Sequence, residues 1–199
     1  EGATLPEIND EFLKAHSVEA GAGVDGLREK CRGALSKERD KAVQSRLKVQ
    51  VLDQLLAANR IEIPEALIAQ EIPRLRQEAA GRMNMAKVDP EKLKDLLPDA
   101  AFQDSARKRV SLGLLLSEVI KSQSLKLDGT KVEAALDAIA MDYEQPDQVK
   151  QFYRTRQDLM QGLGAMVMED QVVDALMAGG TVTETKLSLD DLMNPKSAA

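Results

Sequence analysis

The longest stretch without a helix breaker, Val24 to Asn59, sets the scale of any fold that this chain can adopt. It contains no proline, and no glycine after Gly33. Because these two residues interrupt helices most strongly, the stretch predicts a single helix of about 35 residues. Apolar residues recur every seven positions along it, at Leu35, Ala42, Val49 and Leu56. Polar residues such as Glu38 break the companion seam, so we expect a spine helix packed on its own domain and no coiled coil.

A second informative stretch, Arg107–Tyr153, reads as helix, turn, helix, turn, helix, with each helix apolar on one side. Its first helix, at about 104–122, is apolar nearly all round at its centre, so we expect it to be the most buried element. No pair of side chains in this stretch is suited to acid–base or nucleophilic chemistry. We therefore expect the stretch to act through apolar surface.

Start and stop residues predict further helices. We expect a short helix at 10–15 and another that begins at Pro64 and continues past Pro73. A loop follows at 83–88, and Asp89-Pro90-Glu91 then starts a helix by capping it. Three more helices are expected. The first starts with a capping box of Thr130 and Glu133, and the second starts at Gln145-Pro146. The third runs from about residue 158 to about residue 178. Residues 181–189 alternate like a short extended strand, with no partner strand in this chain.

These elements predict an all-α fold, with one long spine and a series of antiparallel helix pairs. Aromatic residues make up only 3% of the chain and tryptophan is absent. The core must then be filled by aliphatic side chains and methionine, which are compatible with helices.

Composition excludes several classes of function. The net charge of −6 argues against a nucleic-acid surface, which needs clustered lysine and arginine. The only cysteine, Cys31, and the only histidine, His16, have no companions for a disulfide, a metal site or a catalytic set. No phosphate-binding glycine loop follows a strand, and no apolar run reaches the roughly 18–20 residues that span a bilayer. We therefore predict no catalytic residues, no cofactor, no metal, no nucleic-acid partner and no membrane span.

Three segments carry a resemblance to a known family. They are NRIEIPEALIAQEIPRLRQEA, RKRVSLGLLLSEVIKSQSLKLDGTKVEAALDAIAMDYEQPDQVKQFY and MVMEDQVVDALMAGGTVTETKLSLDDLM. They resemble the C-terminal domain of bacterial trigger factor, and the opening LPEINDEFLKAHSVEAGAGVDGLREKCR is similar to the junction after that family's prolyl-isomerase domain. The resemblance covers essentially the whole chain, in order.

The resemblance implies a cytoplasmic, ribosome-associated, ATP-independent chaperone domain that shields nascent or unfolded proteins. It implies a helical body with two arms that form a cradle. The family's isomerase (rotamase) domain and ribosome-binding loop match nothing here, so we assign neither activity to these residues. The family's link to cell division belongs likewise to the parent protein. The chain begins at Glu1 and not at Met, so we expect sequence upstream of it.

Combining both lines of reasoning, we expect one chaperone domain over residues 1–199. It would comprise an opening segment (1–23), the spine (24–59), arm 1 (63–122), arm 2 (130–178) and a tail (181–199). The expected client contacts on arm 1 are Leu67, Ile68, Ile72, Leu75 and the tip residues Met83 and Met85. Those on arm 2 are Ile139, Tyr143, Val149 and Phe152.

Two alternatives remain open at this stage. The first is a periplasmic chaperone with a related helical cradle, which a signal peptide upstream would favour. The second is a structural homo-oligomerisation module, in which the apolar faces of several copies bury one another. Sedimentation at rising concentration separates the chaperone from the oligomerisation module. A monomer or weak homodimer that binds unfolded protein supports the chaperone, and a tight oligomer supports the module.

Overall fold

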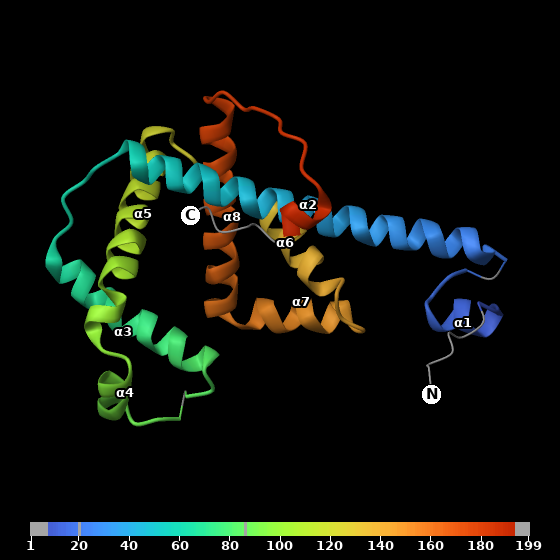
Figure 1. Cartoon of the computed structure of the whole chain (residues 1–199), viewed down its shortest axis with the longest axis horizontal. Coiled ribbons are helices and arrows are strands. Elements are labelled where there is room, and N and C mark those ends of the chain that lie inside the picture. Colours follow the sequence, from blue (N-terminus) through green and yellow to red (C-terminus); the bar gives the residue numbers. More distant parts are fainter. Residues whose placement is uncertain (1–7, 20, 86, 194–199) are drawn as a thin grey trace. The chain divides into compact units, whose positions relative to one another are not determined.

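The computed structural model describes residues 8–19, 21–85 and 87–193 of the chain (Figure 1). This part of the chain is all-α, as predicted, and contains no strand. Its α-helices are α1 (Asp10–Ala15), α2 (Gly23–Ala58), α3 (Glu65–Arg82), α4 (Pro90–Leu96), α5 (Gln103–Ser122), α6 (Gly129–Ala140), α7 (Pro146–Thr155), α8 (Gln157–Ala178) and α9 (Leu189–Met193), with a 3-10 turn, η1 (Asp99–Phe102), before α5.

The chain forms two compact units. Unit 1 consists of residues 1–47 and 183–199, and unit 2 of residues 48–182. Helix α2 contributes its first part to unit 1 and its last turns to unit 2, and each unit is described by itself. The single chaperone domain and its cradle remain predictions, and the portions of the opening segment and tail at 1–7, 20 and 194–199 lie outside the described residues.

Unit 1 joins the start and the end of the chain to the first part of α2. Asn9 caps α1 by accepting a hydrogen bond from the Phe12 backbone N–H at 2.9 Å. Lys30 of α2 donates to the carbonyls of His16, and of Ser17 at 3.2 Å, which fixes the turn after α1. Residues 181–188, expected to be extended, have no regular secondary structure and lead into α9, where Arg46 donates to the Asp191 carbonyl at 2.9 Å.

Arm 1 of unit 2 comprises α3, α4, η1 and α5. Its core contains Ile68, Ile72 and Ala106, with Ile63, Leu75 and Phe102 packed around them. Arginines of α5 pair with carboxylates of α3: Arg107 with Glu65 at 3.0 Å, and Arg109 with Glu71 at 3.2 Å and Glu78 at 2.9 Å. Apolar burial and ion pairs therefore hold α3 to α5.

Arm 2 comprises α6, α7 and α8. Its core contains Val132 and Leu136 of α6 and Leu163 and Val167 of α8. Tyr153 of α7 packs on this cluster. The last turns of α2 attach to α8 through Lys48, whose ammonium lies 2.9 Å from Glu169 and 2.7 Å from Asp170.

The structure corrects three predictions. α6 begins at Gly129, and its cap is Asp128, which accepts from the Thr130 backbone N–H at 2.8 Å. The capping box of Thr130 and Glu133 is therefore wrong, because Asp128 already serves the first turn and Glu133 pairs with Arg154 at 2.7 Å. α3 begins at Glu65, so Pro64 lies just outside it as the cap residue.

The third correction concerns α5, which is not the most buried helix of the described chain. Only Ala106 of α5 is buried, whereas α8 buries Leu163, Gly164, Val167, Val172 and Val173. α5 contacts α3, η1 and α8, and most of its apolar side chains are left half-buried. An apolar surface all round a helix shows what the helix could bury, but the number of neighbours decides what it does bury.

Candidate functional site

The predicted client contacts of arm 2 divide into an inner and an outer group. Ile139 packs against the arm-2 core and Val149 is half-buried. Tyr143 and Phe152 are 59% and 55% exposed. Met141, which we did not select, is 77% exposed, the most exposed large apolar side chain of the described residues. We call Met141, Tyr143 and Phe152 the arm-2 patch.

The backbone beneath the arm-2 patch is hydrogen-bonded. The turn after α6 is closed by hydrogen bonds from the Met141 N–H to the Asp137 carbonyl (3.0 Å) and from the Tyr143 N–H to the Ala140 carbonyl (3.1 Å). Pro146 then starts α7, since its fixed φ suits the first helical position. The apolar side chains of the patch are thus held in the open by a structured turn and helix.

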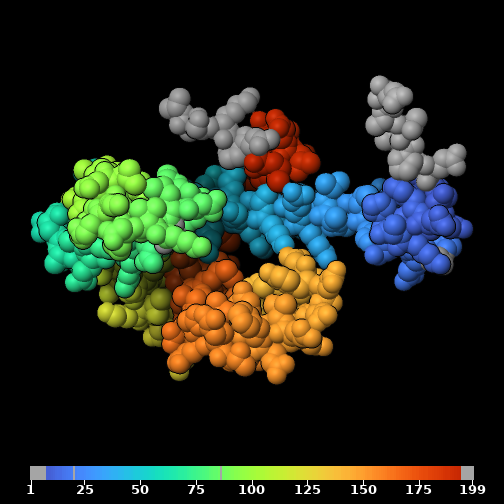
Figure 2. All heavy atoms as spheres, turned by 90° about the horizontal axis from the view of Figure 1, so that it is seen from below, coloured from blue at the N-terminus to red at the C-terminus, as the bar shows by residue number. Residues whose placement is uncertain are grey.

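The spacing of residues in α7 explains why one aromatic side chain is half-buried and the other is exposed. Val149 and Tyr153 are four residues apart and share the inner face, whereas Phe152 lies on another face. Figure 2 shows the surface of this region in orange. The Arg156 guanidinium carbon lies 5.8 Å from the centroid of the Phe152 ring, a cation–π contact that leaves the ring half exposed.

Ion pairs connect α7 to α6 and the end of α7 to the start of α8. Lys150 lies 2.6 Å from Asp137, and this pairing raises the pKa of the Lys150 ammonium. Arg156 pairs with Asp158 at 2.7 Å and thereby lowers the pKa of that carboxyl group. These charges stay ionised over the neutral range, and Arg156 places one of them beside the exposed Phe152 ring.

On arm 1, most predicted contacts are occupied by the fold. Ile68 and Ile72 are only 1% and 4% exposed, so a client could reach them only after α3 had moved away from α5. Leu67, Leu75 and Met85 are half-buried. Met83 alone is open, 59% exposed at the end of α3, where Asn84 takes a positive φ of 55° and turns the chain.

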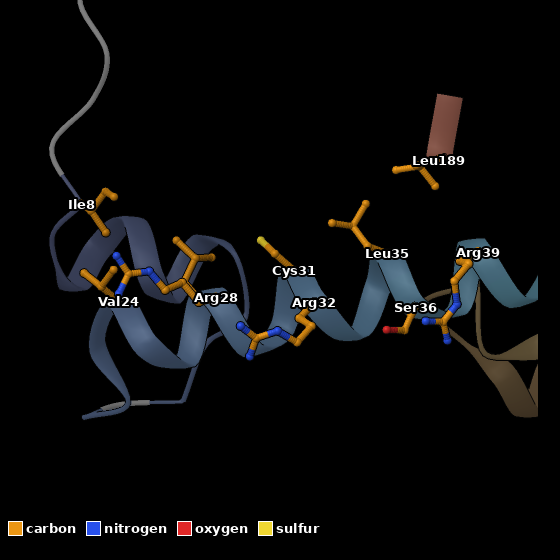
Figure 3. A pocket seen from close by; sticks show the side chains of 10 residues that line it. Ile8, Val24, Arg28, Cys31, Arg32, Leu35, Ser36, Arg39 and Leu189 are labelled. Atoms are coloured by element: carbon orange, nitrogen blue, oxygen red, sulfur yellow. The ribbon is translucent and has the colours of Figure 1, made fainter. Parts of the chain in front are cut away.

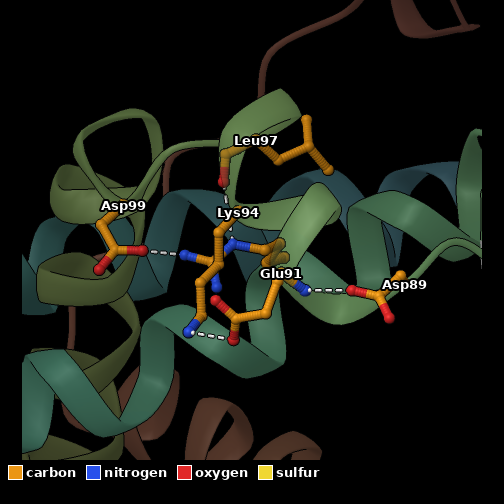
Figure 4. Close-up of polar contacts among 6 residues, drawn as sticks. Asp89, Glu91, Lys94, Leu97 and Asp99 are labelled. Atoms are coloured by element: carbon orange, nitrogen blue, oxygen red, sulfur yellow. Dashed lines mark hydrogen bonds and ion pairs between the residues drawn. The ribbon is translucent and has the colours of Figure 1, made fainter.

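Arm 1 also contains a buried charge that we did not anticipate. Arg76 is 5% exposed and follows Ile68 and Ile72 on the same four-residue spacing. Its Nε donates to the Leu97 carbonyl at 2.9 Å, and its guanidinium pairs with Asp99. Figure 4 shows Leu97 and Asp99 converging there. Arg76 thus ties the segment between α4 and η1 to α3.

The described residues contain no group of three or more histidine, cysteine, aspartate or glutamate side chains that could hold a metal ion. None of the helices in that part of the chain is both long enough and apolar enough to cross a membrane.

Comparisons with known proteins identify the family of the chain. Residues 23–178 match the family described as bacterial trigger factor protein (TF) C-terminus. The trigger factor of Thioalkalivibrio sulfidiphilus is 42% identical over 193 residues, which cover 97% of this chain and 43% of that protein. The trigger factors of Alkalilimnicola ehrlichii and Pseudoalteromonas atlantica are 40% and 38% identical, over 98% and 99% of this chain and 43% and 45% of their own lengths.

The chain thus spans less than half the length of these relatives. The match runs through the whole of α2 and both arms, the same region that carries the arm-2 patch and the two arm cores. The chain belongs to the trigger factor family and corresponds to the family's C-terminal domain.

Proposed function

We propose that this domain is an ATP-independent chaperone that binds exposed apolar segments of nascent or unfolded proteins and keeps them from aggregating. The observation that carries the proposal is the arm-2 patch, with three large apolar side chains more than half exposed on a hydrogen-bonded framework. Such side chains mark an interaction site when they form a contiguous exposed patch. Met141 adapts to partners of varied shape because its side chain is flexible and polarizable.

The energetics suit reversible holding. Burial of one large apolar side chain contributes at most about 1.5–3 kcal/mol, and association subtracts the cost of ordering both partners. Three such contacts give useful affinity without trapping the client. Met83 at the tip of arm 1 supplies a further contact, whereas Ile68 and Ile72 serve the arm-1 core.

The proposal includes a cytoplasmic location and, as partners, unfolded or nascent polypeptides. Contact with the ribosome and isomerase activity would come from domains that are not among these residues. Neither the periplasmic chaperone nor the oligomerisation module has an observation in its favour.

The test replaces Met141, Tyr143 and Phe152 together by serine and measures how much protein halves the light scattering of an aggregating unfolded client. We expect the required concentration to rise at least about tenfold, since a loss of about 1.4 kcal/mol suffices for that factor. The matched control replaces Leu114 and Val182, exposed apolar residues outside arm 2, and should change little. Unchanged suppression by the triple variant, with its helicity intact, would remove the patch from the client site.

A further inference from the structure

Unit 1 carries a second apolar surface, separate from the arms. Val24, Leu27, Cys31 and Leu35 follow one another at intervals of three and four residues and so form one row along α2. This row is the floor of a groove of about 650 Å³ (Figure 3). Val24 and Leu35 are 42% and 54% exposed, so the described chain leaves much of the row uncovered.

The walls of this α2 groove are basic. Arg28, Arg32 and Arg39 line it, and none of its described lining residues is acidic, although the chain as a whole has a net charge of −6. Each arginine pairs with a carboxylate of a neighbouring position on α2, at Asp25, Glu29 and Asp40. The side chains in these pairs are 56–89% exposed, and exposed pairs are weak. The guanidinium groups can therefore exchange these partners for the carboxylates of a ligand.

Part of the chain itself lies at this groove. Leu189, the first residue of α9, lines one end of it, and Figure 3 shows Cys31 and Leu35 pointing to the side on which Leu189 lies. Two acidic residues, Asp190 and Asp191, follow Leu189 directly. Leu189 is still 53% exposed, and α9 has only five residues, so this one apolar side chain lies at one end and the described chain leaves the rest of the row open.

We propose that the α2 groove binds an acidic amphipathic helical segment of a partner protein. Apolar side chains at i, i+3 or i+4 of that segment would fit along Val24, Leu27, Cys31 and Leu35, as in helix-in-groove recognition. Its carboxylates would face Arg28, Arg32 and Arg39. This site lies in unit 1 and shares no residue with the arm-2 patch, so it does not depend on the proposed client site.

The experiment uses a fluorescent 18-residue helical peptide with leucine at i and i+4 and acidic residues at its flanks. Its matched control carries lysine at every acidic position. We expect saturable binding of the acidic peptide by anisotropy, and binding of the basic peptide at least tenfold weaker. Equal binding of both peptides, or no binding of the acidic one, would overturn the proposal.

Cys31 gives a readout at the site itself, because it is the only cysteine and is exposed. Saturating acidic peptide should slow the reaction of Cys31 with a thiol reagent at least fivefold. An unchanged rate with peptide bound would place the peptide elsewhere and contradict the proposal.

Charge reversal separates this groove from general attraction to arginine. Arg28→Glu with Arg32→Glu should weaken the acidic peptide at least tenfold and strengthen the basic one. Reversal at Arg60 and Arg82, exposed residues of unit 2, makes the same change in net charge and should leave both affinities nearly unaltered. The serine variant of the arm-2 patch should keep full peptide affinity. Self-association that protects Cys31 without any peptide would identify a second copy as the occupant and overturn the proposal.

Discussion

Arm 1 buries its apolar stripe of Ile68 and Ile72, and the buried Arg76 continues that stripe. Arm 2 instead fills its core with aliphatic residues and leaves Tyr143 and Phe152 exposed to solvent. Both arms are built from helices of ordinary length that pack on one another. The difference lies in which side chains remain after the helices have packed. The apolar stripe that holds arm 1 together cannot bind clients, whereas Phe152, on another face of α7, is available to bind them.

The largest expected effect tests the interior of arm 1. Ile68→Ala should lower the free energy of unfolding by about 2–5 kcal/mol, because it leaves a cavity beside Ile72 and Ala106. Urea denaturation followed by circular dichroism measures this loss. A variant with normal stability and reduced client holding would reverse the comparison, since Ile68 would then face clients and not the core.

The second effect concerns the buried arginine of arm 1. Arg76→Met keeps a long side chain but removes the donors to the Leu97 carbonyl and Asp99, and should cost about 1–3 kcal/mol. Hydrogen exchange should accelerate first in residues 97–102. Arg74→Met, two positions away at an exposed site, is the matched control and should have little effect. Equal exchange in the two variants would contradict a structural role for Arg76.

The smallest effect concerns how α2 attaches to each arm. Burial alone would lower the pKa of Lys48, but its pairs with Asp170 and Glu169 outweigh burial and raise the pKa. Because the folded pKa exceeds the unfolded one, this stabilisation is complete below the ordinary lysine pKa, about 10.4, and is lost as pH rises through the folded value.

We therefore expect the urea midpoint to fall at alkaline pH, and Lys48→Met to flatten that dependence. Lys108 pairs with Asp53 at 2.7 Å between α5 and α2, but its side chain is 62% exposed. Lys108→Met should change the profile less. A larger change from Lys108 would mean that arm 1, and not arm 2, is the more firmly anchored of the two.

Sequence reasoning predicted the helices well because their boundaries depend on local chemistry. Asp89 caps α4 and Pro146 starts α7, as expected from their neighbours alone. It failed at the start of α6, where both Asp128 and Thr130 could cap the helix. In the structure the Asp128 side chain accepts the hydrogen bonds of the first turn.

Burial was harder to predict, because it depends on contacts between distant parts of the chain. The stripe of Ile68 and Ile72 was visible in the sequence. Its packing partner Ala106 lies 34 positions after Ile72 and could not be identified from the sequence. Arg76 continued the same spacing and could have signalled a buried charge. Met141 could not be chosen either, since only the turn after α6 decides that it points outward.

The most direct test of the account compares both arms in one unmodified protein. Methyl-labelled methionine and isoleucine are observed by NMR while an unfolded client is added. We predict that Met141 broadens or shifts first, with a weaker response at Met83, while Ile68 and Ile72 stay unchanged. Perturbed Ile68 and Ile72 signals together with an unaffected Met141 would contradict the central claim that clients bind the exposed patch of arm 2.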